Sequence, residues 1–491
     1  MKRLFLILFA ASTLGMMANT LRFDQSKETT QSLTMPSGET VTYKAWEGIY
    51  FVTNIEDSVY QTLNFYFPDG ADQNTPILLR TYVGGYMAST AKSPSADDAT
   101  GRALLEGYAV CIPGSRGSNS TVKRGGGTIY TGRAPAALLD LKAAVRYLKF
   151  NDQLMPGDAN RIISDGTSAG GAMSALLGAT GNHPLYQPYL QAMGAAPATD
   201  DIFAAVCYCP ITDLDYADAA YEWLYFNVRS EDDSHDTLSK LLASTYLSRI
   251  NALNMRSIFT GEPVNPTNYR DYVKQFLINS LQHAQDEGAD LPDSIGIVRF
   301  EQQSMPFAAM TDGNRPPVDG RAAPMMGRGG RMQFAPRKSE FIIDLNLDTY
   351  LRYVASTQPL KQVPAFDALN ILGGEASAEN NVFGDDKGNP ANFSLTATHV
   401  NGTVIDQATQ KRVRLYNPMC FIDDMQSSVA PNWYIRHGAR DRDTAFTVSI
   451  NLATKLSNSG RNVDFALPYN RPHSGDYNLN DLFRWIKSIA E

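Results

Sequence analysis

One serine stands between two glycines in the stretch RIISDGTSAGGAMSALLGATGN, residues 161–182. An apolar run precedes Ser168, and a segment rich in alanine and leucine follows it. A strand, a tight turn and a helix in this order form a nucleophile elbow, in which glycines avoid a clash of Cβ atoms. A glycine-rich phosphate loop is the alternative, but no Gly-Lys-Ser/Thr follows. Ser168 is therefore predicted to attack a carbonyl carbon.

The base predicted to activate Ser168 is His473. A serine hydroxyl needs a base and an acid that orients it, and after an elbow the chain order is serine, acid, histidine. His473 lies in the loop NRPHSGDYN, after the last predicted strand. The other histidines follow the nucleophile helix too closely, fall in an insertion or lie beside strands: His183, His235, His283, His399 and His437.

The acid is expected just after the strand that precedes the histidine loop. The segment HGARDRD there offers two carboxylates, Asp441 and Asp443. In a His-Gly-x-x-Asp arrangement at a strand end, the acid falls at Asp441. For Asp443 the sequence leaves three readings open: a solvated loop charge, a cap, or a contact with the substrate.

Two N–H groups are needed to stabilise the negative oxygen of a tetrahedral intermediate. One is the N–H of Ala169, which directly follows the nucleophile. The second is expected from Gly84 or Gly85, at the end of the hydrophobic strand TPILLRTYVGG. These glycines let the backbone approach the oxygen closely.

Alternating strands and helices must position these groups. Residues 134–152 have apolar residues at three- and four-residue spacing, which predicts an amphipathic helix. Continuous apolar runs such as IFAAVCYCPI predict strands that are buried on both faces. The sequence therefore predicts an α/β-hydrolase core with a mostly parallel sheet and helices on both faces.

The core is expected in two pieces, because the strand pattern stops after Pro210 and resumes near the C-terminus. We predict core segments over 19–210 and 396–491, and between them a large, mainly helical lid over 211–395. Inside the lid, residues 305–336 are rich in Gly, Pro, Met and Arg, which is typical of a long loop.

Residues 1–18 resemble a signal peptide, with Lys2 and Arg3 before a short apolar run and Ala18 as the small residue before a cut. This predicts an exported protein, in the periplasm or outside the cell. The net charge of −8 argues against nucleic acid or an anionic membrane as a partner. No later segment has the 18 or so uninterrupted apolar residues of a membrane span.

The four cysteines do not form a disulfide scaffold in a chain of 491 residues. They are expected to be mostly buried free thiols, with a disulfide between distant cysteines left open. Since Cys207 and Cys209 have no cluster of His or Cys beside them, zinc is disfavoured. The prediction is of an enzyme without metal or cofactor; no feature indicates its oligomeric state.

Four segments together resemble the bacterial tannases, the tannin acyl hydrolases: APAALLDLKAAVRYLKFND, GTSAGGAMSALLGATGN, CYCPITDLDYADAAYEW and RHGARDRDTAF. The similarity runs from about residue 40 to the C-terminus. It implies an α/β-hydrolase with a large lid that cleaves galloyl esters, from methyl gallate to hydrolysable tannins. It also implies a triad of Ser168, Asp441 and His473.

The resemblance further implies how the galloyl ring is held. Family members use a lysine and a glutamate from the lid and an aspartate two residues after the catalytic one. In this sequence these are Lys361, Glu375 and Asp443. Phenols both donate and accept hydrogen bonds, so two carboxylates and one ammonium suit three hydroxyl groups. Such a site rejects analogues without those hydroxyls more sharply than an apolar pocket does.

Other functions are also considered. Fungal tannases and some feruloyl esterases have cysteines beside the catalytic serine and histidine, where this chain has Thr167 and Pro472, so it resembles the bacterial type. A feruloyl or general aryl carboxylesterase on the same scaffold is the main alternative. A non-catalytic binding protein is disfavoured by the complete set of catalytic residues, and a peptidase by the absence of a large propeller or of a site for a peptide terminus.

Overall fold

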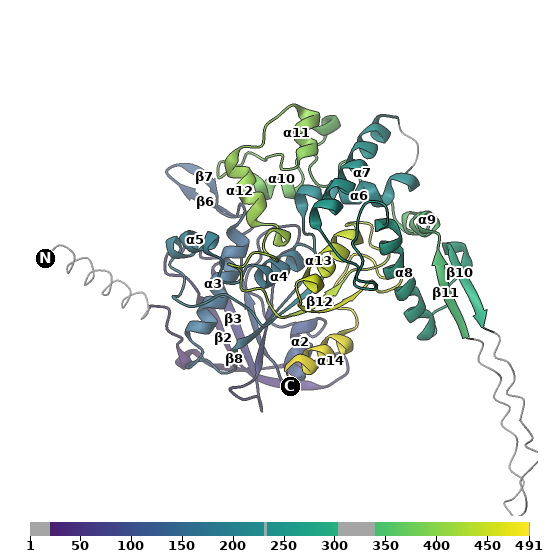
Figure 1. Ribbon diagram of the computed structural model, residues 1–491. Coiled ribbons are helices and arrows are strands. Elements are labelled where there is room, and N and C mark those ends of the chain that lie inside the picture. The colour runs from purple at the N-terminus through teal and green to yellow at the C-terminus, as the bar shows by residue number, and fades with distance from the viewer. Residues whose placement is uncertain (1–19, 230–232, 303–338, 491) are drawn as a thin grey trace, which may run out of the picture.

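Residues 20–229, 233–302 and 339–490 are described by a computed structural model of the chain (Figure 1). The predicted signal peptide, residues 1–18, and the Gly-, Pro-, Met- and Arg-rich loop, residues 305–336, lie outside the described residues.

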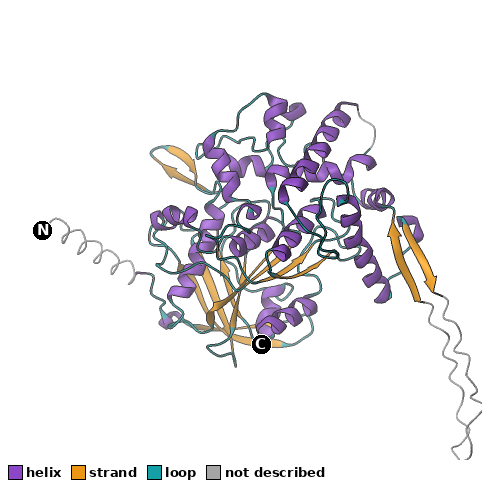
Figure 2. Ribbon diagram, in the orientation of Figure 1, coloured by secondary structure: helices purple, strands orange, loops and turns teal. Residues whose placement is uncertain are grey.

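A nine-stranded sheet forms the centre of the described part, in the order β1-β2-β3-β5-β4-β8-β9-β12-β13. The pairs from β5 to β13 are parallel, and those from β1 to β5 are antiparallel. The predicted α/β fold with a mostly parallel sheet is therefore confirmed (Figure 2). The strands are β1 (Thr29–Thr34), β2 (Thr40–Tyr50), β3 (Thr62–Pro68), β4 (Pro76–Arg80), β5 (Ala109–Pro113), β8 (Asp158–Thr167), β9 (Ala204–Tyr208), β12 (Asn432–Arg436) and β13 (Asn462–Ala466).

Helices cover both faces of this sheet and form two apolar cores. On one face lie α3 (Ala136–Phe150), α4 (Ala169–Ala179), α5 (Gln187–Ala192) and α13 (Phe446–Asn458). On the other face lie α2 (Ala99–Leu105) and the C-terminal α14 (Leu479–Ala490), which contact each other. The apolar strands are buried from both sides, as a parallel sheet requires.

Helix α3 differs from the sequence-based expectation. The pattern predicts one polar face, but every residue from Ala136 to Leu148 is buried. Its charged side chains have buried partners instead of solvent: Asp140 pairs with Arg116, and Lys142 pairs with Asp200. Periodicity reports only where apolar residues fall, so it cannot show that polar residues have partners inside the protein.

The strand pattern is interrupted between β9 and β12 by a largely helical insertion. It contains α6 (Ala217–Tyr225), α7 (Asp233–Leu253), α8 (Tyr269–Asp286), β10 (Ile297–Gln302), β11 (Ser339–Leu345), α9 (Leu347–Thr357), α10 (Ala378–Phe383), α11 (Leu395–Asn401) and α12 (Gln407–Leu415). The boundaries of the lid at 211 and 395 stay predictions. Helix α12 contacts α10, and α11 contacts the short turn Ile371–Gly373 that precedes α10 (Figure 1).

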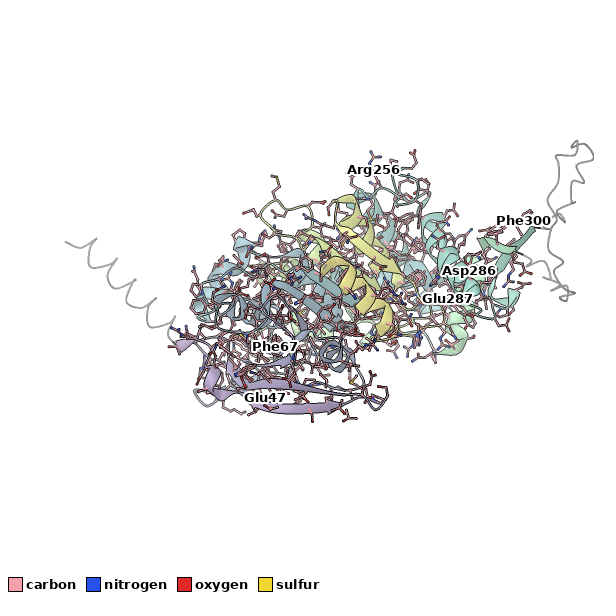
Figure 3. The ribbon with its side chains drawn as sticks, turned by 90° about the horizontal axis from the view of Figure 1, so that it is seen from below. Glu47, Phe67, Arg256, Asp286, Glu287 and Phe300 are labelled. Atoms are coloured by element: carbon pink, nitrogen blue, oxygen red, sulfur yellow. The ribbon has the colours of Figure 1, made fainter. Side chains whose placement is uncertain are left out.

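Two small hairpins lie outside the main sheet. Strands β10 and β11 pair beside α8, and β6 (Thr121–Arg124) pairs with β7 (Gly127–Tyr130). Seen from below, Phe300 of β10 lies at the far side of the molecule from Glu47 and Phe67 of the main sheet (Figure 3). The β6–β7 hairpin is joined to the insertion by a hydrogen bond from the N–H of Tyr130 to the carbonyl of Asp386, 2.8 Å.

All four cysteines are free thiols, and Cys111, Cys207 and Cys209 are buried. Strand β9 ends at Tyr208, and Cys209 follows with a positive φ of 42°, so the two neighbouring cysteines are not both strand residues as the sequence pattern indicates. Among the described residues, no helix is long and apolar enough to cross a membrane.

Candidate active site

Ser168 lies at the turn between β8 and α4, with φ 61° and ψ −124°. A non-glycine residue with positive φ is strained by about 1–3 kcal/mol, and such strain clusters at functional sites. The turn is held by a hydrogen bond from the N–H of Ser168 to the carbonyl of Tyr208 in β9, 2.9 Å. The geometry is that of a nucleophile elbow, with the serine at the N-terminus of a helix.

The glycines on either side of Ser168 are required by close backbone contacts. A Cβ on Gly166 would lie 2.3 Å from the carbonyl oxygen of Gly170, which closes the turn from the other side. A Cβ on Gly170 would lie 2.9 Å from the carbonyl oxygen of Val83. The turn is therefore too tight for any side chain at these two positions.

Three predicted residues that are far apart in the sequence meet at this turn. The Nε2 of His473 lies 2.9 Å from the Oγ of Ser168, and its Nδ1 lies 2.6 Å from Oδ2 of Asp441. Since a carboxylate only accepts, Nδ1 carries a proton and donates it, and Nε2 accepts from the serine hydroxyl. This is the arrangement that activates a serine for attack on a carbonyl.

Backbone hydrogen bonds fix the loop of His473 against the loop of Asp441. The N–H of Ala439 donates to Pro468, and that of Arg440 donates to Arg471, at 3.1 and 3.0 Å. A Cβ on Gly438 would lie 2.2 Å from the carbonyl oxygen of Arg471, so the two loops pass closely only because this residue is glycine. The spacing between acid and base is thus set by backbone, not by flexible side chains.

The contacts shift the pKa values of the acid and the base in opposite directions. Burial would raise the pKa of Asp441, but His437 and His473 outweigh it and hold that pKa well below its usual value. Burial would lower the pKa of His473, but the hydrogen bond and charge of Asp441, with the charge of Asp443, raise it above 6.5. The positive charge of Lys361 opposes this rise.

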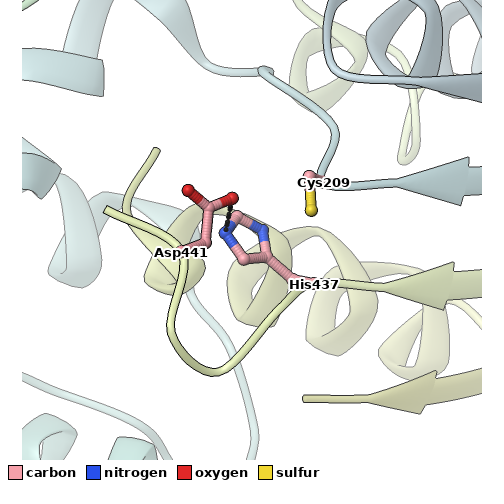
Figure 4. A group of neighbouring side chains, drawn as sticks. All are labelled: Cys209, His437 and Asp441. Atoms are coloured by element: carbon pink, nitrogen blue, oxygen red, sulfur yellow. Dashed lines mark ion pairs between the residues drawn. The ribbon is translucent and has the colours of Figure 1, made fainter. Parts of the chain in front are cut away.

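A second imidazole contacts the acid. His437 is fully buried, and its Nε2 lies 3.0 Å from Oδ2 of Asp441 (Figure 4). Cys209 lies beside both, and its thiol contacts the carbonyl of Ser474 at 3.4 Å. The sequence-based interpretation assigned His437 to a strand end with no role. The spacing of four residues to Asp441 was the signal that could have identified it.

The predicted oxyanion residues lie on two adjoining segments. Ala169 is the first residue of α4 and is buried. Gly84 and Gly85 follow β4, and Gly85 has a positive φ of 54°. The segment that leads to them is pressed against the start of α4, because a side chain on Gly170 would meet the carbonyl of Val83. This loop therefore lies close to the serine turn.

Helix α6 of the insertion joins two predicted substrate residues. The hydroxyl of Tyr221 accepts from the N–H of Lys361 at 3.0 Å and donates to the carbonyl of Arg442 at 2.6 Å. One turn later, the hydroxyl of Tyr225 donates to the carbonyl of Asp441, 2.8 Å. The segments that carry Lys361 and Asp443 are thus fixed to the same helix, beside the acid.

Of the three predicted galloyl-binding residues, two have charges that act on His473: Lys361 and Asp443. Asp443 is partly exposed and pairs with Arg442, 3.1 Å, and Nζ of Lys361 lies 4.7 Å from the centre of the Phe366 ring. Glu375 lies exposed in the loop before α10 and makes no hydrogen bond or ion pair within the described parts of the chain.

A different carboxylate of the insertion is buried near Lys361. Glu379 in α10 is 8% exposed; burial raises its pKa, and the positive charge of Lys361 opposes the rise. Its charge also acts on Tyr86, which directly follows Gly85. Sequence reasoning missed Glu379, since a glutamate on a short helix carries no signal of its burial.

A buried ion cluster lies under three segments of the site. Arg80, the last residue of β4, contacts Asp165 at 2.5 Å and both carboxylate oxygens of Asp476 at 2.9 and 2.5 Å. Asp165 comes three residues before Ser168, and Asp476 three residues after His473. The cluster therefore joins the serine turn, the histidine loop and the strand that leads to Gly84.

Comparison with known proteins shows similarity to esterases. A family model described as BD-FAE matches residues 63–260. The esterase LipC of Mycobacterium tuberculosis is 45% identical over 58 residues, which are 12% of this chain and 14% of that protein.

Solved structures match over nearly the whole chain. The tannin acyl hydrolase from Lactobacillus plantarum is 35% identical, with a TM-score of 0.81, over 97% of this chain and 100% of that one. A tannin acyl hydrolase in complex with ethyl gallate matches with the same identity, TM-score and coverage. The tannase of Fusobacterium nucleatum is 32% identical, with a TM-score of 0.80, over 96% of this chain and 99% of that one.

Proposed function

Because this chain belongs to the bacterial tannases and is a carboxylic ester hydrolase, we propose that it cleaves galloyl ester and depside bonds. Its substrates are simple gallate esters and hydrolysable tannins, and its product is gallic acid. The observation that carries the proposal is the hydrogen-bonded series Ser168–His473–Asp441, with distances of 2.9 and 2.6 Å. It lies in a chain of which 97% matches a tannin acyl hydrolase in complex with ethyl gallate.

In the first half of the reaction, His473 removes the proton of Ser168 as Oγ attacks the ester carbonyl. Asp441 holds the imidazole in position and stabilises its positive charge. The N–H of Ala169, with that of Gly84 or Gly85, stabilises the negative oxygen. His473 then gives its proton to the leaving alcohol, and a galloyl-serine remains.

In the second half, His473 removes a proton from water, which attacks the galloyl-serine. The same two N–H groups stabilise the second oxyanion. Collapse of this intermediate returns the proton to Ser168 and releases gallate. No metal or cofactor is needed in either half.

Substrate choice is assigned to Lys361, Glu375 and Asp443. Asp443 supports this role because one of its carboxylate oxygens lies within 4.8 Å of a ring nitrogen of His473. Lys361 supports it because its positive charge opposes the rise in the pKa of His473. Glu375 is exposed and has the freedom to turn toward a bound ring. Carboxylates accept hydrogen bonds from the ring hydroxyls, and the ammonium donates one. A bound ring that covers these groups but lacks the hydroxyls would leave them without partners, which disfavours its binding.

A side-by-side assay on methyl gallate, methyl protocatechuate and methyl ferulate tests this function. We expect turnover of methyl gallate and very low turnover of methyl ferulate. Comparable kcat/KM on both would contradict the proposal and support a general aryl carboxylesterase. The Ser168→Ala variant should lose all activity.

Paired variants test the assignment of Glu375. Glu375→Gln should lower kcat/KM on methyl gallate by about tenfold or more, the kinetic equivalent of one hydrogen bond to a charged group, and leave 4-nitrophenyl acetate unaffected. Glu379→Gln is the matched control, because it changes a carboxylate on the same segment. If Glu379→Gln lowers kcat/KM on methyl gallate and Glu375→Gln does not, Glu379 rather than Glu375 contacts the ring hydroxyls.

We also assign export to residues 1–18 and a lid function to residues 211–395. Export predicts that the protein recovered outside the cytoplasm begins at Asn19. N-terminal sequencing checks this, and an intact Met1 on that protein would contradict it. The lid is supported by Lys361, which the insertion places beside the acid through Tyr221.

A further inference from the structure

The acid Asp441 contacts two imidazoles, of which the proposed reaction uses one. The second belongs to His437, at the end of β12, and both side chains are fully buried. We infer that His437 is a positioning residue, which donates a hydrogen bond to Asp441 and thereby sets both its orientation and its strength as an acceptor for His473. This inference relies on the Ser168–His473–Asp441 triad of the proposed function.

The partners of His437 define where its proton lies. Its Nε2 faces Oδ2 of Asp441 at 3.0 Å and the carbonyl of Thr444 at 3.3 Å. Both of these oxygens are acceptors, so Nε2 carries a proton. Its Nδ1 lies 2.8 Å from the hydroxyl of Ser449 in α13, which can donate to it. Ser449 thus favours the form of the ring that donates to Asp441.

Donors surround Asp441 on both oxygens. Oδ1 accepts from the N–H of Asp443 at 2.7 Å and of Thr444 at 3.2 Å. Oδ2 accepts from His473 at 2.6 Å, and it lies 3.0 Å from Nε2 of His437. Without His437, one side of Oδ2 would face no donor in a buried site, which is costly for a charged group. The carboxylate would then have His473 as the one imidazole beside Oδ2.

Of the other titratable groups around the pair, three are neutral near neutral pH, whereas Asp443 and Lys361 carry opposite charges that act on His473 and that His437 variants leave unchanged. Burial raises the pKa of the Cys209 thiol and of the Tyr225 and Tyr477 hydroxyls far above their usual values, so all three stay neutral. Asp443 faces His473 and adds negative charge there. Removal of His437 therefore acts mainly on Asp441 and, through it, on His473.

The direction in which the pKa of His473 changes follows from the position of Oδ2 of Asp441, which lies beside both imidazoles. When His437 no longer donates, Asp441 becomes a stronger acceptor and stabilises the imidazolium form of His473. The pKa of His473 then rises. Because the reaction needs neutral His473, the acid limb of the pH profile of kcat/KM must move to higher pH. A residue that only fills space would not move this limb.

The experiment compares His437→Phe with His437→Gln, with 4-nitrophenyl acetate as the probe, so that galloyl recognition plays no part. For His437→Phe we expect kcat to fall by about tenfold to a hundredfold, with little change in KM, as for loss of one hydrogen bond to a charged group. The acid limb should move to higher pH. Gln offers an amide N–H in place of Nε2, so His437→Gln should recover most of both effects.

Ser449→Ala is the second variant, in case His437→Phe fails to fold. It removes the donor to Nδ1 and should lower kcat in the same direction, by less than His437→Phe. The inference is wrong if a folded His437→Phe variant keeps the kcat and the acid limb of the wild type. It is also wrong if His437→Phe and His437→Gln lose kcat equally. Failure of the proposed triad is distinguished by Ser168→Ala: if it still hydrolyses 4-nitrophenyl acetate, the triad itself is wrong.

Discussion

At the scale of single residues, two charges act on His473 in opposite directions. Asp443 stabilises the imidazolium, and Lys361 destabilises it. The same two side chains are proposed to hold the galloyl hydroxyls, so substrate recognition and the basicity of His473 are linked. A substitution made to alter specificity must also alter the pH dependence of the reaction.

Two variants separate these effects through the pH profile. In Asp443→Asn a negative charge that favours imidazolium is lost, so the pKa of His473 falls and the acid limb of kcat/KM moves to lower pH. In Lys361→Met a positive charge is lost, so the limb moves to higher pH. Both are measured on 4-nitrophenyl acetate. Shifts in the same direction, or none, would show that these charges do not reach His473.

The residues that the sequence could predict are those whose role follows from chain order. Ser168, Asp441 and His473 each occupy a set place relative to a strand, and the structure brings them together. Tyr221 and Glu379 could not be found in this way, because their contacts depend on the path of the insertion and on burial. His437 was missed although its spacing of four residues to Asp441 offered a signal.

At the scale of elements, the ends of the strands are joined beneath the site. Arg80 ends β4, Asp165 lies in β8, and Asp476 lies in the histidine loop. Burial raises the pKa of each carboxyl, and Arg80 counteracts this. The three groups stabilise one another only as a set, because two buried carboxylates without the guanidinium would repel.

Arg80→Met tests this link. Breaking a buried ion pair by removing one partner costs about 3–5 kcal/mol, so Tm should fall clearly. The kcat should fall as well, because the serine turn and the histidine loop lose a common anchor. Arg102→Met is the control: the ion pair Arg102–Glu106 is partly exposed, with side chains 31% and 39% accessible, and is worth less than about 1 kcal/mol. Equal Tm values for the two variants would contradict the account.

The helices and strands show where the periodicity of apolar residues is sufficient to predict local structure and where it is not. The helix after Ser168 and the strands around it form where the apolar runs predict them, although β4 and β9 end earlier than their runs do, at Arg80 and Tyr208. Helix α3 is buried on all sides, against the expectation from its pattern. The side chains that pair with its charged residues, Arg116 and Asp200, are distant in the sequence. They come next to the helix only when the chain folds.

At the scale of the whole molecule, a parallel sheet carries the reacting groups and an insertion between β9 and β12 carries most of the groups proposed to choose the substrate (Figure 1). The sequence could predict this division, because the strand pattern stops and resumes. It could not predict that α6 would bind the two parts together through Tyr221 and Tyr225. Hydrogen bonds from tyrosine hydroxyls to carbonyls that are distant in the sequence cannot be predicted from amino-acid composition.

The most direct test of the central claim is a crystal structure of Ser168→Ala with methyl gallate. We expect the ester carbonyl next to residue 168 and His473, with its oxygen toward the N–H of Ala169. The ring hydroxyls should contact Lys361, Glu375 and Asp443. A ring bound with its hydroxyls away from these three side chains, or an ester bound away from residue 168, would contradict it.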